Sequence, residues 1–261
     1  VTKNVADMVL ADDNFATIVE AVGEGRSIFD NIRKFLRYLL TSNMGEVTAM
    51  LLGTLLAGVI GLQADGGTGI VLPLLATQIL WINLVTDTAP ALAMGVDPSV
   101  EDVMGRRPRR TSEKVIDRQM WTDVLTTGIL MGILMLLTMD MFLPGGLIEG
   151  HDSIEVARTA AFTTLVFAQL FFALCARSET VSAFHHMFSN KWMWGAIALG
   201  VVLQIAVVEV PFLQAGFGTT HLDFQHWAVA VAMASIVLWA DELLKIYRRA
   251  KERRTAGFAA V

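Results

Sequence analysis

Apolar residues gather along this chain into long runs instead of alternating with polar ones. Six runs are long enough to cross a bilayer as helices, at about 37–62, 72–94, 121–143, 157–176, 192–213 and 226–247. A hydrocarbon core of about 30 Å requires about 20 predominantly apolar residues in a helix. The pattern therefore predicts an all-α polytopic membrane protein, with a six-helix transmembrane bundle over residues 37–247.

Residues 1–25 have the pattern of ordinary soluble sequence. Met8-Val9-Leu10 is a short strand candidate. Asp13 or Asn14 can cap a helix that begins near Phe15, because short polar side chains accept hydrogen bonds from the first turn of a helix. The mixture predicts a short α/β segment ahead of the membrane helices.

A second helical pattern starts at Arg26 and continues without a proline to about Leu62. At the usual rise per residue this helix would be about 50 Å long. That length exceeds the hydrocarbon core of about 30 Å. Residues 26–36 are therefore predicted to form a stalk helix outside the membrane.

The basic residues predict how the helices are oriented. Lys and Arg occur in the stalk, in the loops at 95–120 and 177–191, and in the tail at 248–261, whereas the loops at 63–71, 144–157 and 214–225 have none. Cytoplasmic loops of membrane proteins carry the excess of Lys and Arg. The alternation predicts six spans with both ends in the cytoplasm and a basic cytoplasmic tail.

Composition supports a membrane protein and excludes several other classes. The chain is 54% hydrophobic and 17% charged, with a mean hydropathy of +0.54, so the lipid bilayer is an expected partner. No long basic stretch lies outside the membrane flanks, and we expect no nucleic-acid partner. Cys175 is the single cysteine, so a disulfide within the chain is impossible. A secondary transporter would predict an internal repeat, and none is found.

Polar side chains inside three of the apolar runs form a candidate cation site. They are Asn43, Glu46, Asn83, Thr86, Asp87 and Gln169. The members of the first run are three residues apart, and those of the second have helical i, i+3 and i+4 spacing, so each set shares a helix face. Carboxylate and amide oxygens are the ligands that calcium prefers. Pro90 would free backbone carbonyls nearby and open the helix around the site.

The alternative interpretation of these residues is that they hold helices together. A single Asn or Thr in a membrane helix more often bonds to a neighbouring helix than to an ion. A carboxylate differs, because it costs about 2.5–3.5 kcal/mol at the centre of a membrane helix. Two carboxylates on faces that also carry amides favour an ion site.

Other acidic residues lie near the ends of the predicted spans. Asp140 and Glu209 are expected to reach the outer interface. Asp241 and Glu242 lie near the inner end of the last span, where pairing with Lys245 is the expected role.

Several motifs together resemble P-type cation-transporting ATPases of the calcium-pump-like group. They are Asp7–Phe15 (DMVLADDNF), Ser42–Glu46 (SNMGE), Trp81–Asp87 (WINLVTD), Asp241–Lys245 (DELLK) and the loop around Asp102–Met104 and Arg107–Arg109. The motifs occur in the family's order and at its separations. The resemblance covers essentially the whole chain and corresponds to the C-terminal third of such a pump.

The resemblance implies a role for each region. Residues 1–25 would be the end of the cytoplasmic phosphorylation domain, and the six spans would be the fifth to tenth of the pump. Matches to positions that ligate the transported ion are Asn43, Glu46, Asn83, Thr86 and Asp87. Gln169 stands where sarcoplasmic-reticulum-type pumps have a glutamate. Plasma-membrane-type pumps also have glutamine there but lack a carboxylate matching Glu46, so the number of ions per cycle is open.

The resemblance also implies partners outside these residues. The phosphorylation motif, the nucleotide-binding domain and the actuator motif do not occur in the sequence, and phosphoryl transfer requires such parts. ATP and Mg²⁺ would therefore act only through the N-terminal part of the same pump, and this piece alone is expected not to hydrolyse ATP. Calcium is the ion that the resemblance implies, and a prokaryotic-type cell membrane is the expected location. The alternatives are sodium, manganese or protons as the ion, or a non-catalytic membrane module or split-pump subunit.

Overall fold

The computed structural model describes residues 14–62, 71–98, 104–105, 114–148, 150–185 and 187–259. Within these ranges it contains helices and no strand, which confirms the all-α membrane class. The helices are α1 (Phe15–Leu55), α2 (Ala76–Trp81), the π-helix η2 (Ile82–Thr86), α3 (Thr88–Gly95), α4 (Arg118–Phe142), α5 (Ile154–Cys175), α6 (Lys191–Glu209), α7 (Pro211–Phe217) and α8 (Phe224–Ala259). The predicted strand at 8–10 lies outside the described residues.

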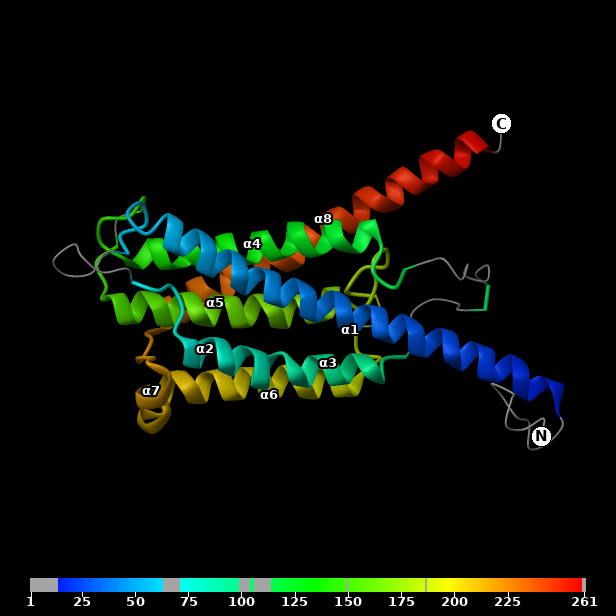
Figure 1. Cartoon of the computed structure of the whole chain (residues 1–261), viewed down its shortest axis with the longest axis horizontal. Coiled ribbons are helices and arrows are strands. Elements are labelled where there is room, and N and C mark those ends of the chain that lie inside the picture. Colours follow the sequence, from blue (N-terminus) through cyan, green and yellow to red (C-terminus); the bar gives the residue numbers. More distant parts are fainter. Residues whose placement is uncertain are drawn as a thin grey trace.

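The long helices run side by side along the molecule (Figure 1). Helix α1 packs mainly on α4 and also on α3, while α5 packs on α4, α8 and α6. Most side chains of α5 are buried, so this helix forms the centre of the bundle. The beginning of α1 and the end of α8 project from the same end of the bundle (Figure 1).

Four helices are long and apolar enough to cross a membrane in the described part of the chain, namely α4, α5, α6 and α8. The other two predicted spans correspond to the later part of α1 and to α2, η2 and α3 in succession. Polar candidate ligands interrupt the apolar sequence of α1, and a π-helix divides the second span into short pieces. That all six segments cross the membrane stays a prediction.

The sequence was wrong about the extent of α1. It predicted separate helices from Phe15 and from Arg26, whereas one helix runs from residue 15 to residue 55. Asn14 caps it as predicted, with its side-chain oxygen accepting the Ala16 N–H at 3.0 Å. The helix does not reach Leu62: it ends at Leu55 with Leu56 as its C-cap, and turns follow as far as Gly61, which has a φ of +72°.

Two other boundaries also differ from prediction. The fifth span was expected over 192–213, but α6 ends at Glu209. Pro211 has no N–H to continue the helix, and it starts the short helix α7 instead. The last span was expected to end at 247, whereas α8 continues to Ala259.

Small residues let α1 and α4 approach closely. A β-carbon on Gly128 would lie 2.6 Å from Met44 Cβ, and one on Gly132 would lie 2.7 Å from Thr48 Cβ and 2.9 Å from the Ala49 backbone nitrogen. Glycines four residues apart are a common device for close helix contact in membranes. This contact fixes the face of α1 that carries Glu46.

Candidate cation site

Glu46 is the centre of the predicted site. Its Oε2 accepts a hydrogen bond from Asn83 Nδ2 at 2.7 Å, and its Oε1 accepts one from Gln169 Nε2 at 3.3 Å. These three residues come from α1, η2 and α5, respectively. The fold therefore joins predicted ligands that are far apart in the sequence.

Asp87 lies at the junction between η2 and α3, and Tyr38 of α1 holds one side of its carboxylate. The Tyr38 hydroxyl donates to Asp87 Oδ1 at 3.0 Å. Asp87 Oδ2 is buried and has no hydrogen-bond partner in the described part of the chain. Asp87 follows Asn83, the donor to Glu46, by four residues, which places the two carboxylates in the same part of the bundle. The second carboxylate therefore presents one unpaired oxygen inside the bundle.

A π-helix opens the backbone beside Asp87. The Asp87 N–H bonds to the Ile82 carbonyl, five residues back, at 2.9 Å. The Thr88 hydroxyl donates a hydrogen bond to the Asn83 carbonyl oxygen at 3.2 Å. Pro90 has no N–H to offer the Thr86 carbonyl. Single π-helical turns occur often at functional sites, and this one lies where the second span was predicted to open.

The remaining predicted ligands lie in two different settings. Thr86 is buried, and its hydroxyl bonds to the Ile82 carbonyl of its own helix at 3.0 Å. Asn43 is exposed, and its Nδ2 bonds to the Leu39 carbonyl at 2.8 Å. Neither side chain joins the hydrogen-bonded group around Glu46.

Tyr38 is a site residue that sequence reasoning missed. It is fully buried and stacks near Phe172. It precedes Glu46 by a little over two helical turns, so both lie on a similar side of α1. That spacing was the available signal for this contact.

The donor chemistry suits a hard cation. In the described ranges no group of three or more His, Cys, Asp or Glu side chains could hold a metal ion. The oxygen donors at the site are the carboxylates of Glu46 and Asp87, with the amides of Asn83 and Gln169 beside Glu46. Gln169 Oε1 is buried without a hydrogen-bond partner among the described residues, as is Asp87 Oδ2. Unpaired oxygens of these two types are ligands that calcium takes in proteins.

Several other buried carboxylates of the described chain have cationic partners, which those of the site lack. Asp241 pairs with Lys245 at 2.8 Å, as predicted, and with Arg37 at 3.2 Å. Asp123 pairs with Arg248 through both of its oxygens. No Lys, Arg or His of the described residues pairs with Glu46 or Asp87. Glu46 and Asp87 are therefore two buried carboxylates whose charge no cation of the described residues compensates.

The interface prediction for Asp140 was wrong. Its side chain is fully buried and accepts the Leu147 N–H at 2.8 Å and the Ile148 N–H at 2.9 Å. The loop after α4 folds back over this carboxylate, which is why it does not reach the surface. Asp140 therefore holds a turn by neutral hydrogen bonds.

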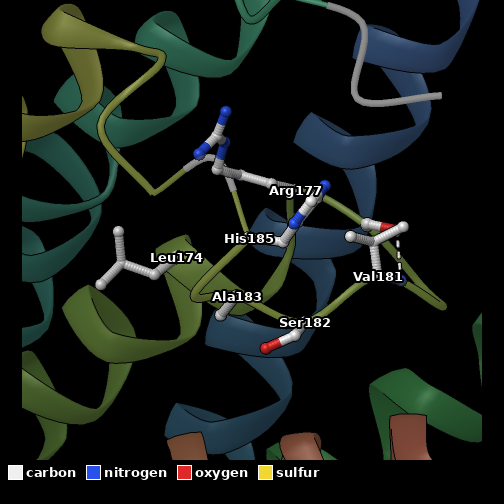
Figure 2. A pocket seen from close by; sticks show the side chains of 7 residues that line it. Leu174, Arg177, Val181, Ser182, Ala183 and His185 are labelled. Carbon is white, nitrogen blue, oxygen red and sulfur yellow. Dashed lines mark hydrogen bonds between the residues drawn. The ribbon is translucent and has the colours of Figure 1, made fainter.

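A small pocket lies at the connection between α5 and α6 (Figure 2). Its lining consists of Leu174, Arg177, Ser178, Val181, Ser182, Ala183 and His185. It contains none of the six predicted ligands. The pocket is therefore separate from the candidate cation site.

A bundle of membrane helices around an uncompensated pair of carboxylates is the arrangement of a cation-transport protein. The family description that matches residues 71–247 is "Cation transporting ATPase, C-terminus". The chain belongs to this family of cation-transporting ATPases.

Relatives from distant organisms are similar along nearly the whole chain. The calcium-transporting ATPase of Bacillus subtilis is 40% identical over 90% of this chain and 25% of its own length. Calcium-transporting ATPase 1 of Bacillus cereus is 34% identical over 95% of this chain and 28% of its own length. The endoplasmic reticulum-type calcium-transporting ATPase 2 of Arabidopsis thaliana is 32% identical over 97% and 28%. The chain thus spans about a quarter of the length of these relatives.

Proposed function

We propose that this chain is the calcium-binding transmembrane part of an ATP-driven pump. The observation that carries the proposal is the buried pair Glu46 and Asp87, which has no cationic partner in the described residues. Two negative charges in a membrane bundle require compensation, and a divalent cation supplies it. The printed names of the relatives identify them as calcium-transporting ATPases, which supports calcium over sodium, manganese or protons.

The hydrogen bonds suggest how the ion enters. Asn83 and Gln169 point amide N–H groups at Glu46. When a cation binds between them, each amide turns its carbonyl oxygen toward the ion, and the Glu46 oxygens become ligands too. The unpaired Asp87 Oδ2 needs no such rearrangement. The amides therefore satisfy Glu46 in one state and ligate the ion in the other.

The same pair of carboxylates accounts for counter-transport of protons. Once the cation leaves, two charged carboxylates would remain in a poorly hydrated bundle, which is costly. Proton uptake at this stage removes the charge. The pump would then carry protons in the direction opposite to calcium.

The driving reaction belongs to the remainder of the pump. ATP hydrolysis, with its Mg²⁺, takes place in the cytoplasmic domains, and the stalk at 26–36 transmits the resulting change to Glu46. We further propose six spans with both ends in the cytoplasm and a cell membrane of prokaryotic type as the location.

Phosphorylation of the full-length pump from ATP tests this function. Calcium should stimulate phosphorylation of the natural protein, and Glu46→Gln should require about tenfold more calcium or beyond, because calcium affinity depends on the number of charged ligands. Sodium, manganese and protons are tested in parallel at matched ionic strength. Phosphorylation that one of these supports and calcium does not would overturn the choice of calcium.

Asp140→Asn is the matched control. It also removes a buried membrane-embedded carboxylate, but one that accepts only backbone N–H groups. It should lower the amount of folded protein and leave the calcium requirement of the remainder unchanged. An equal loss of calcium affinity in Glu46→Gln and Asp140→Asn would contradict a specific site.

A further inference from the structure

A buried carboxylate at the end of α3 joins several parts of the bundle. The Asp97 side chain is 0% exposed. Its Oδ2 lies 2.7 Å from Lys34 Nζ, and its Oδ1 lies 3.0 Å from Arg177 Nε and 2.9 Å from Asn190 Nδ2. Lys34 comes from α1, Arg177 lies just after the end of α5, and Asn190 is the N-cap of α6.

Further hydrogen bonds hold the backbone of the same segment. Asn31 Nδ2 donates to the Asp97 carbonyl at 2.9 Å, and Asn190 Nδ2 donates to the Ala93 carbonyl, also at 2.9 Å. Lys34 Nζ also donates to Asn31 Oδ1 at 3.0 Å. The last turn of α3 is thus bonded to α1 and α6 through both side chains and backbone.

This segment is directly continuous with the candidate cation site. Helix α3 begins at Thr88, immediately after Asp87, and ends two residues before Asp97. About 15 Å of backbone, mostly helical, therefore separates the two aspartates. On α1, Tyr38 contacts Asp87 one turn after Lys34 contacts Asp97. Helices α1 and α3 are consequently joined at two levels, one at the site and one at the stalk.

Building on the proposed function, we propose that Asp97 is a positioning residue that couples the stalk end of α1 to the ion ligand Asp87. A displacement of the stalk pulls Lys34 and, through the carboxylate, the end of α3. Because α3 is a continuous helix, the displacement reaches Asp87. Two cations share this one carboxylate, so its removal leaves Lys34 and Arg177 facing each other and lets α1 slide past α3.

A merely structural role makes a different prediction. If Asp97 only stabilises the fold, its loss reduces the amount of folded pump, and each surviving molecule works normally. If Asp97 couples the two helices, surviving molecules hydrolyse ATP without moving the ion in step. Calcium transported per ATP hydrolysed separates these two roles, because the ratio does not depend on the amount of protein.

The experiment compares three variants of the full-length pump in sealed vesicles. Asp97→Asn should lower the ratio of calcium taken up to ATP hydrolysed by about threefold or more, within the range by which single residues alter coupling between sites. Lys34→Met keeps Asp97 paired with Arg177 and Asn190, so it should fold readily and give a smaller decrease. Equilibrium calcium binding without ATP should stay near normal in both variants.

Asp117→Asn is the matched control. Asp117 also pairs with the stalk, through Arg33 at 2.8 Å, but it lies at the start of α4 and not on α3. Asparagine keeps the helix cap that Asp117 provides for the Met120 N–H. The ratio should be unchanged in this variant.

The outcomes distinguish the two proposals. A normal ratio in Asp97→Asn and Lys34→Met, with normal uptake in the natural pump, overturns the coupling role and leaves the proposed function intact. An equal decrease of the transport ratio in Asp117→Asn also overturns the coupling role, because any carboxylate paired with the stalk would then have the same effect. No calcium uptake by the natural pump overturns the proposed function, and the coupling role with it.

Discussion

The buried carboxylates at the two levels of the bundle differ in what neutralises them. At the stalk end, Asp97, Asp123 and Asp241 each pair with Lys or Arg. Deeper in the bundle, Glu46 and Asp87 accept hydrogen bonds from neutral groups, among them two amides and a phenol. Carboxylates therefore link helices at the stalk end, whereas deeper in the bundle they are available to bind a transported cation.

The difference teaches that burial alone does not mark an ion ligand. Asp140 is as buried as Asp87, yet two backbone N–H groups satisfy it. What sets Asp87 apart is an oxygen without any partner in the described chain. An oxygen without a hydrogen-bond partner, and not depth, is therefore what distinguishes Asp87 from Asp140.

The largest expected effect on stability comes from removing a carboxylate that pairs with buried cations at the stalk end. Asp241→Asn leaves Arg37 and Lys245 buried without their shared anion. Removal of one partner from a buried pair costs about 3–5 kcal/mol. We expect a large decrease in thermal stability of the full-length pump in detergent, with unchanged calcium affinity in the protein that stays folded. Glu46→Gln should show the reverse, so a destabilised Glu46→Gln would contradict the contrast.

The next largest effect should come from disturbing the close contact between α1 and α4. Gly132→Ala would push a methyl group against Thr48 and the backbone of Ala49, and overpacking of this kind costs about 1–3 kcal/mol. The melting temperature should fall. Gly195→Ala is the control, since a β-carbon there meets nothing within 4 Å. Equal melting temperatures for the two variants would show that α1 and α4 are not tightly packed.

The effect of Gln169 depends on the number of ions. With one ion per cycle, Gln169→Ala should be mild, and Glu46→Gln should weaken binding less than Asp87→Asn does. With two ions, Gln169→Ala should be harmful, and Glu46→Gln should be nearly as damaging as Asp87→Asn. The stoichiometry of bound calcium per phosphorylated pump decides between these cases. A harmful Gln169→Ala in a pump that binds one ion would contradict this account of the site.

The smallest effect concerns pH at the stalk. Partial burial alone would raise the pKa of Asp117, but hydrogen bonds from the Met120 N–H and Arg33, with the Arg33 charge, outweigh it and lower the pKa. A lowered pKa contributes stability above the unfolded value of about 3.9, and that contribution is lost as pH falls through the folded value. Because the Asp117 side chain is 44% exposed, the effect should be small. In Asp117→Asn the melting temperature should depend slightly less on pH between pH 5 and 3 than in the natural protein. An equal pH dependence in the two proteins would contradict the lowered pKa of Asp117.

The sequence predicted the helices better than the contacts between them. Apolar runs located α4, α5, α6 and α8 because membrane helices require such runs. The cap at Asn14 followed from its side-chain chemistry. The long continuous helix through Arg26 was missed because propensity alone does not show whether two adjacent helical patterns join. Pro211 carried a visible signal for the end of α6 that the apolar run concealed.

The predicted site was brought together in part. Glu46, Asn83 and Gln169 form one hydrogen-bonded group, and Asp87 lies near it, whereas Asn43 is bonded to its own helix. The π-helix and the Tyr38 contact depend on how α1 and η2 pack against each other. No local pattern encodes that packing, so the detailed geometry could not be obtained from the sequence.

Direct calcium binding to Asp87→Asn in the full-length pump tests the central claim most directly. Asparagine keeps the size and one oxygen but removes the charge that no Lys or Arg of the described chain compensates. Equilibrium binding, normalised to folded protein and compared with Asp241→Asn, should show affinity lost by about tenfold or more in Asp87→Asn alone. Near-normal calcium affinity in Asp87→Asn would contradict the assignment of the site.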